Sequence, residues 1–187
     1  GGALEVEDSG DLLLSDCAFS GNTALGRGGA VVTWDVNGTI ERCSAWQNTG
    51  RDGGAFALRS WDGPDFKSCT IVDNRATASY YGAAVDVEGT DLIGIRDCVI
   101  AFNRGGCAVR PQSSSSPVFT CSALYGNGGG DWSGQMAHWL DVNGNLRADP
   151  TFCNLTEDDL RLDPASPCLP ENNTCGVLIG ALGQGCE

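Results

Sequence analysis

The sequence predicts an all-β fold, a parallel β-helix in which short strands wind into a solenoid of about five to six coils of roughly 26 residues each. Three observations favour this fold. Cysteines, asparagines and small residues recur in register through residues 1–127, apolar and polar residues alternate over short stretches, and no segment has convincing helical periodicity. We expect one domain over 1–187, with regular coils over 1–127 and a last irregular coil and cap over 128–187.

Two columns of residues define the repeat. Cysteines recur at intervals of 26, 26, 29 and 23 residues, and an asparagine follows each cysteine by five residues, or by six in the last unit. The columns are Cys17, Cys43, Cys69, Cys98 and Cys121, and Asn22, Asn48, Asn74, Asn103 and Asn127. Because stacked strands place like residues above one another, we expect the asparagine amides to pair along the axis. The cysteines are expected to be mostly buried thiols that pack as small hydrophobic side chains, with disulfides between some of them as the alternative.

The elements of one unit follow in a fixed order. A small-residue triplet such as Gly28-Gly29-Ala30 opens the unit and fits a tight corner. The alternation after the triplet, as at Val85 and Val87, predicts a first short strand. A second strand ends just before the cysteine, and a third begins after it, while asparagine and glycine supply the turns. Three such strands in about 26 residues fit a coil of parallel strands better than a flat antiparallel sheet.

The repeat phrases also carry a family resemblance. The unit with "GGA" and "FSGN" resembles the right-handed parallel β-helix repeat proteins of bacterial surfaces, notably polymorphic outer-membrane proteins and autotransporter passengers. The tail "GNLRADPTFCNLTEDDLRLDPASPC" is similar to the ends of secreted bacterial β-helix repeat proteins. The resemblance implies a right-handed coil and a secreted, extracellular or bacterial cell-surface location. It says little about activity, because such solenoids include lyases, hydrolases, adhesins and fibres.

The tail breaks the repeat and is rich in cysteine. We expect it to cover the open strand edges of the last coil. Pairing of neighbours along the chain predicts the disulfides Cys153–Cys168 and Cys175–Cys186, although four cysteines allow three connectivities and free thiols are a further alternative. Cys107 replaces an alanine of the triplet, which leaves open a bridge to Cys121 or to the tail.

Composition excludes several classes of function. Asp and Glu number 24 against 11 Lys and Arg, and the formal charge of −13 argues against nucleic acid and against anionic membranes as partners. Ten cysteines without CxxC spacing are typical of an oxidised, extracytoplasmic protein. No apolar run approaches the roughly 18 residues that a membrane helix requires, so we expect no membrane insertion.

No catalytic group stands out. The clusters typical of galacturonase-like enzymes, such as Gly-His-Gly, are missing, and the Asp-Asp within residues 157–160 falls in the tail. The single histidine, His138, lies between apolar neighbours. We therefore predict no catalytic, cofactor-binding or resident metal site, and no more than weak Ca²⁺ binding by the acidic loops 5–11 and 86–91.

Tryptophan-aspartate pairs are the candidate ligand contacts. Trp34-Asp35 and Trp61-Asp62 follow the same strand on consecutive coils, where exposed rings beside carboxylates would form a platform for a sugar ring. The alternative is that both rings fold over the coil edge and shield apolar atoms.

The function expected from these patterns is a non-catalytic extracellular or cell-surface β-helix with a structural or adhesive role. Because the sequence begins directly on a repeat at Gly1, a fragment of a longer solenoid and a head-to-tail fibre subunit that stacks on itself are specific hypotheses. The alternatives are a carbohydrate-active lyase or hydrolase and a carbohydrate-binding module that acts on extracellular polysaccharide. Expected partners are therefore other copies of the chain or extracellular glycans.

Overall fold

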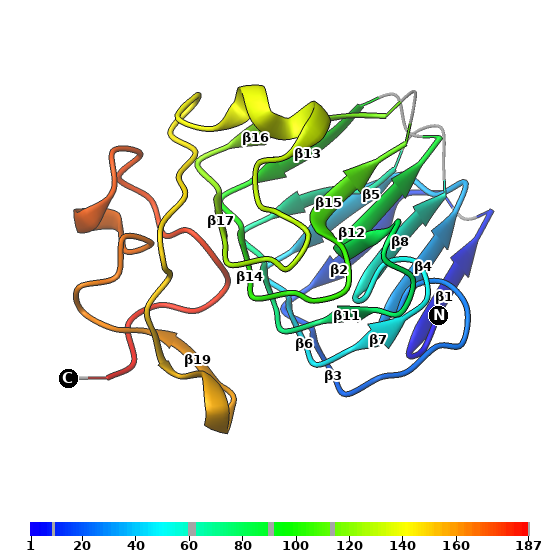
Figure 1. Ribbon diagram of the computed structural model, residues 1–187, viewed down its shortest axis with the longest axis horizontal. Coiled ribbons are helices and arrows are strands. Elements are labelled where there is room, and N and C mark those ends of the chain that lie inside the picture. The colour runs from blue at the N-terminus through cyan, green and yellow to red at the C-terminus, as the bar shows by residue number, and fades with distance from the viewer. Residues whose placement is uncertain (9, 60–62, 90–91, 113–114, 187) are drawn as a thin grey trace.

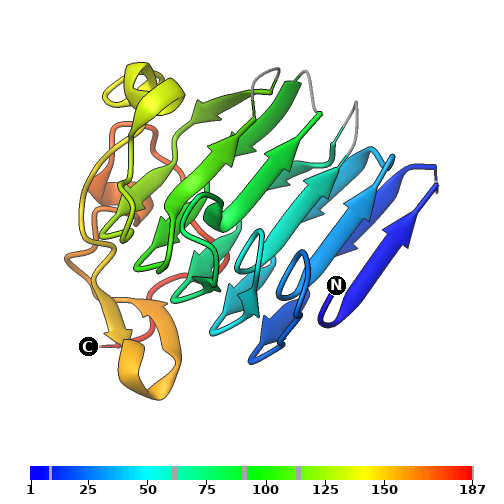
Figure 2. The same cartoon turned by 45° about the vertical axis from the view of Figure 1, so that its right-hand side comes forward.

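The computed structural model describes residues 1–8, 10–59, 63–89, 92–112 and 115–186. It confirms the predicted fold, a right-handed parallel β-helix, because almost every strand pairs in parallel with the equivalent strand of the next coil (Figure 1). Three parallel sheets of five strands each run along the solenoid, and the coils succeed one another from the N-terminal to the C-terminal end (Figure 2).

Each coil contributes one strand to each of these sheets. Sheet A contains β1 (Leu4–Glu7), β4 (Val31–Trp34), β8 (Phe56–Arg59), β12 (Gly82–Glu88) and β15 (Cys107–Pro111). Sheet B contains β2 (Leu12–Ser15), β5 (Gly38–Glu41), β9 (Asp65–Lys67), β13 (Leu92–Arg96) and β16 (Ser116–Thr120). Sheet C contains β3 (Ala18–Ser20), β6 (Ser44–Trp46), β10 (Thr70–Val72), β14 (Val99–Ala101) and β17 (Ala123–Tyr125). A short pair, β7 (Thr49–Gly50) and β11 (Arg75–Ala76), follows the asparagine column.

The core lies between the three sheets because every second residue of each strand points inward. Phe56, Phe66 and Phe119 are fully buried, and the rings of Phe56 and Phe66 meet edge to face at 5.1 Å between centroids. The triplet forms a corner, as the sequence predicts. A Cβ atom on Gly28, whose φ is +59°, would lie 2.1 Å from the Val31 carbonyl oxygen, so no larger residue fits there.

The asparagine ladder is confirmed. Along it, each side-chain Nδ2 donates to the Oδ1 of the next asparagine, at 2.9 to 3.0 Å. The same Oδ1 also accepts the backbone N–H of the preceding asparagine. The ladder ends at Asn127, which donates to the carboxylate of Asp131 at 2.8 Å. The ladder therefore satisfies buried backbone groups at the corner and fixes the register of successive coils.

The cysteine column needs a correction at its last member. Val99 pairs with Ala123, so Ser122 stacks on Cys98, and the backbone N–H of Cys98 donates to Ser122 Oγ at 3.2 Å. Cys121 instead occupies the left-handed turn position, with a φ of +47° like the +54° of Asp97. With Ser122 as the anchor, the offset to Asn127 becomes five, as in every other unit.

The other four cysteines of the column are free thiols, three of them buried. Like the asparagine side chains, the thiols of Cys43, Cys69 and Cys98 form hydrogen bonds with backbone groups of neighbouring coils. The Cys69 Sγ donates to the Ile40 carbonyl at 3.3 Å, and the Cys98 Sγ accepts the Cys69 backbone N–H at 3.4 Å. Hydrogen bonding to the Cys69 thiol, together with burial, raises the pKa of Cys43, so this thiol stays protonated and unreactive.

The end of the last coil is closed by residues 131–147. The 3₁₀ helix η1 (Gly134–Trp139) places Met136 in the solenoid core with 1% of its surface exposed. Trp132 packs edge to face on Phe119 at 5.1 Å between ring centroids. Leu146 forms a parallel bridge with Ala123, which adds a fragment of a further coil.

The remaining tail lies along the outer face of sheet C. It contains β18 (Phe152–Asn154) and β19 (Asp159–Leu162), which pair antiparallel, and the 3₁₀ helices η2 (Leu155–Glu157) and η3 (Pro170–Asn172). Ile179 is buried against Val72 and Val99, and the Ala181 N–H donates to Thr70 Oγ1 at 2.9 Å. Residues 148–186 therefore cover the side of the solenoid as well as following its last coil.

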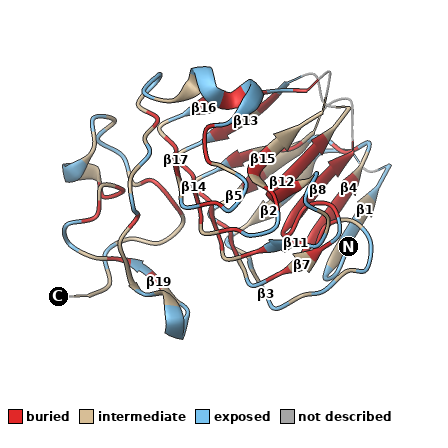
Figure 3. Ribbon diagram, in the orientation of Figure 1, coloured by how far each residue is buried: buried red, intermediate tan, exposed pale blue. Residues whose placement is uncertain are grey.

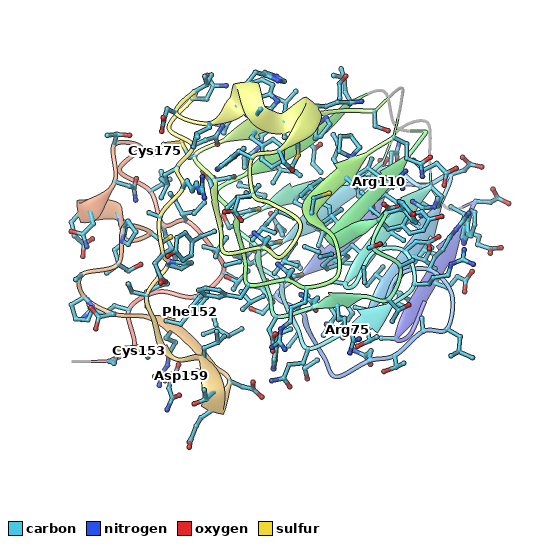
Figure 4. The ribbon with its side chains drawn as sticks, in the orientation of Figure 1. Arg75, Arg110, Phe152, Cys153, Asp159 and Cys175 are labelled. Atoms are coloured by element: carbon cyan, nitrogen blue, oxygen red, sulfur yellow. A yellow bond between two sulfur atoms is a disulfide. The ribbon has the colours of Figure 1, made fainter. Side chains whose placement is uncertain are left out.

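The predicted disulfide pairing is wrong. Cys121 pairs with Cys175, and Cys153 pairs with Cys186 (Figure 4). Cys168 and Cys107 are free thiols, so the predicted bridges Cys153–Cys168 and Cys175–Cys186 and the considered bridge from Cys107 to Cys121 do not form. The tail folds back on itself, where Gln184 bridges Leu162, and this brings Cys186 to Cys153. Burial raises the pKa of Cys168 to about 12.

Candidate functional site: an arginine and carboxylate cluster on sheet A

The outer faces of the three sheets differ. The tail lies beside sheet C and covers its outer face (Figure 3). Sheet B is open to solvent, and its Leu13 and Leu92 are 65% and 66% exposed. Sheet A carries a set of charged side chains outside the core, and three of them, Asp52, Arg59 and Asp86, are buried. We call this set the sheet A cluster. Its members are Arg27, Arg51, Asp52, Arg59, Asp86, Glu88 and Arg110.

The register of the strands assembles this cluster. Outward residues stack in columns, so Asp86 of β12 lies beside Arg110 of β15, and Arg59 of β8 lies beside Glu88 of β12. The corner loops that follow the asparagine ladder add Arg27 and Asp52, which form a parallel bridge with each other. These two residues each stand directly before a Gly-Gly-Ala triplet.

Arg59 is the centre of the cluster. Its side chain is 3% exposed, and its Nη2 lies 2.6 Å from Asp86 Oδ2 and 3.8 Å from Asp52 Oδ2. Its Nε lies 2.9 Å from Glu88 Oε2. A charge this deeply buried is tolerated only when it is paired, and Arg59 meets three carboxylates.

The two buried carboxylates are fully engaged. Asp52 receives Arg51 Nε at 2.8 Å and Arg27 Nε at 3.3 Å. Burial by itself would raise the pKa of Asp52, but its arginine partners outweigh burial and the pKa is lowered. Asp86 contacts Arg59 and Arg110, and it also accepts a hydrogen bond from the Gly82 N–H at 3.1 Å. An ionised, fully bonded carboxylate is a poor proton donor, so Asp52 does not suit the acid role of a glycosidase.

At the edge of the cluster, which we call its rim, two arginine side chains stack on aromatic rings. The Arg27 guanidinium lies over the Trp34 ring at 5.0 Å from its centroid. The guanidinium of Arg110, which is labelled in Figure 4, lies over the Tyr81 ring at 4.8 Å from its centroid. The side chains of Arg27 and Arg110 are 32% and 31% exposed. The cluster holds four arginines against three carboxylates, an excess of one positive charge in a chain of net charge −13.

The predicted sugar contacts have a mixed outcome. Trp34 belongs to the rim of the cluster, where it is half-buried and its Nε1 donates to Glu5 Oε1 at 3.0 Å. Asp35 is exposed, with a φ of +50°, and forms no ion pair within the part of the chain that the structure describes. Trp61 and Asp62 lie outside the described residues. A role of these four residues in sugar binding remains a prediction.

Sequence reasoning missed the arginines and Asp52. Their individual positions look like ordinary solvated charges, and only the strand register brings them together. One signal was present, because Arg27 and Asp52 occupy the same place in consecutive repeats with opposite charge. Opposite charges in one column of a solenoid are expected to pair between coils.

Other candidate chemistry is limited. No group of three or more His, Cys, Asp and Glu side chains that could hold a metal ion occurs among the described residues, and weak Ca²⁺ binding remains a prediction. His138 is exposed and its ring lies 4.7 Å from that of Trp139. No helix within the described ranges is long and apolar enough to cross a membrane.

Comparisons of the chain with protein-family models, with curated proteins and with solved structures gave no match.

Proposed function

We propose that this chain is a non-catalytic extracellular or cell-surface β-helix with an adhesive role, and that it binds acidic extracellular polysaccharide on the sheet A cluster. The observation that supports the proposal is the pair of rim arginines, each held over an aromatic ring and backed by buried carboxylates. The two disulfides support an oxidising, extracytoplasmic environment.

The rim suits carboxylate or sulfate groups on a sugar chain. Guanidinium groups present a planar fork of donors that matches carboxylate and sulfate oxygens. Because Asp52 and Asp86 already hold the arginines, little side-chain entropy is lost when a ligand binds. Salt at physiological ionic strength screens the repulsion between the ligand and acidic side chains more than about 8 Å away. The attraction between the ligand and the rim arginines that it contacts is not screened in this way.

A lyase or hydrolase has less support. The two buried carboxylates of the cluster, Asp52 and Asp86, are bound by arginine, and no imidazole is part of the cluster. We expect acidic polysaccharides, with and without Ca²⁺, to be bound without being cleaved. The fibre hypothesis also has less support, because residues 131–147 already cover the end of the last coil.

Binding to immobilised polygalacturonate, with dextran as the neutral comparator, tests the proposal. We expect Arg27→Ala and Arg110→Ala each to weaken binding to polygalacturonate about tenfold, because each removes a charge-assisted contact. The matched control is Arg96→Ala, which removes an arginine of sheet B that is 55% exposed. Circular dichroism checks that each variant is folded. Unchanged binding in both rim variants, or equal loss in the control, would refute the proposal.

A further inference from the structure

A hollow of about 570 Å³ lies where the asparagine ladder ends. It is bordered by the glycine-rich turn after β17 and by the start of the segment that closes the solenoid. Its polar and aromatic lining consists of Tyr125, Asn127, Asp131, Trp132, Ser133 and Arg147. None of these residues belongs to the sheet A cluster.

The end of the asparagine ladder holds in place the carboxylate of Asp131, which is the hydrogen-bond acceptor of this hollow. The Asp131 Oδ1 accepts both the backbone N–H and the Nδ2 of Asn127 at 2.8 Å, so the carboxylate terminates the ladder. The other oxygen, Oδ2, has longer contacts, with the Gly126 N–H at 3.2 Å and with Arg147 Nε at 3.5 Å. Because Asp131 is only 7% exposed, Oδ2 is held rigidly and retains capacity to accept a hydrogen bond.

Arg147 supplies the donors. Its side chain is 64% exposed, and its only ion pair within the described part of the chain is the 3.5 Å contact with Asp131. Its Nη1 and Nη2 groups make no hydrogen bond to the described residues, so several N–H donors face solvent beside a fixed acceptor. The Ser133 hydroxyl, which can both donate and accept, lies on the same wall.

The charges of Asp131 and Arg147 cancel, so this hollow has no net charge, in contrast to the positively charged rim of the sheet A cluster. A ligand of either charge meets one opposite and one like charge, whereas neighbouring hydroxyls on a neutral sugar can donate to Asp131 and accept from Arg147. Tyr125 offers an aromatic wall, while Trp132 is already fixed through the bond from its Nε1 to the Leu146 carbonyl at 3.2 Å. The volume falls in the range of about 300–1,000 Å³ that is usual for small-molecule sites.

We propose that this hollow binds a neutral monosaccharide unit, through hydroxyl contacts with Asp131 and Arg147. The site is independent of the acidic polysaccharide proposed for sheet A, and it would give the protein a second sugar specificity at the closed end of the solenoid.

Two-dimensional ¹H–¹⁵N NMR of the full chain tests this proposal. The probes are the methyl glycosides of glucose, galactose and mannose, with methyl glucuronide as the charged comparator. We expect at least one neutral glycoside to shift the Trp132 indole N–H and the backbone resonances of 128–133 saturably. Arg147→Ala should weaken that binding about tenfold. Because Arg147 is mostly exposed, the variant should fold normally, which unchanged resonances elsewhere in the spectrum would verify.

The controls separate the two proposals. Arg161→Ala removes an arginine that is 55% exposed in the tail and should leave the shifts unchanged. Arg110→Ala should also leave them unchanged, because Arg110 belongs to the sheet A cluster, so failure of one proposal does not decide the other. The proposal is overturned if no neutral glycoside shifts these resonances, if Arg147→Ala leaves the affinity unchanged, or if the glucuronide binds more tightly than every neutral glycoside.

Discussion

The outer faces of sheets A and C are built on the same coils but are stabilised by opposite means. Sheet C presents Val72, Val99, Ala101 and Ala123, and these residues are buried only because the tail lies over them. Sheet A presents Arg59 and Asp86, which are buried with their charges paired to each other and to the corner loops. The inward residues thus specify the solenoid, whereas the outward residues determine whether a face needs a cover or is available to a ligand.

Removal of one charge from the sheet A cluster should have the largest effect. Asp86→Ala leaves Arg59 buried without its 2.6 Å partner, and breaking a buried pair costs about 3–5 kcal/mol of unfolding free energy. Urea denaturation measures the loss. The double variant Arg59→Met with Asp86→Leu removes both charges and should lose much less than the single one. Equal losses in the single and double variants would show that the unpaired charge of Arg59 is not what destabilises the single variant.

Loss of the disulfide that attaches the tail to the last coil should have the next largest effect. The Cys121–Cys175 bond spans 54 residues, and the double variant Cys121→Ser with Cys175→Ser should lose about 2–4 kcal/mol of unfolding free energy. The tail should then open at lower free energy than the coils, so hydrogen exchange should speed up at Ile179 and Ala181 before it does in the core. Cys107→Ser, at a free and half-buried thiol, is the control. Unchanged exchange in the tail would contradict a covering role for this bond.

The difference between the two faces also explains what the sequence could predict. The inward pattern and the asparagine ladder were predictable because each coil repeats the same local requirement, and Asn22, Asn48 and Asn74 align as expected. Cys121 was misplaced because a cysteine happens to stand one position before the true ladder residue, Ser122.

The outward features depend on relations that local patterns do not contain. The disulfides follow from the path of the tail across sheet C, which places Cys186 and not Cys168 beside Cys153. Likewise, Arg59 and Asp86 are 27 residues apart in the chain, and their contact requires the register of two strands. The sequence therefore predicts the scaffold well and the candidate site poorly.

Acidification should lower the contribution of sheet A to the unfolding free energy but not that of sheet C. We expect this effect to be smaller than those of the Asp86 and disulfide variants. The arginines that contact Asp52 lower its pKa in the folded protein, so its ionised form favours folding. That contribution is complete above the unfolded pKa of about 4 and is lost as the pH falls through the lower folded value. Unfolding free energy should therefore decrease below about pH 4, while the apolar contacts of sheet C contribute no such dependence.

Urea denaturation as a function of pH checks this prediction with two asparagine variants. Asp52→Asn should be less stable than the parent at pH 7 but should lose less stability on acidification, because its side chain no longer takes up a proton. Asp35→Asn, at an exposed carboxylate that follows β4 and has no ion pair among the described residues, should follow the acid dependence of the parent. If Asp52→Asn retained the full acid dependence, the charges of the sheet A cluster would not be the source of the acid sensitivity of this face, and the contrast with sheet C would have to rest on packing alone.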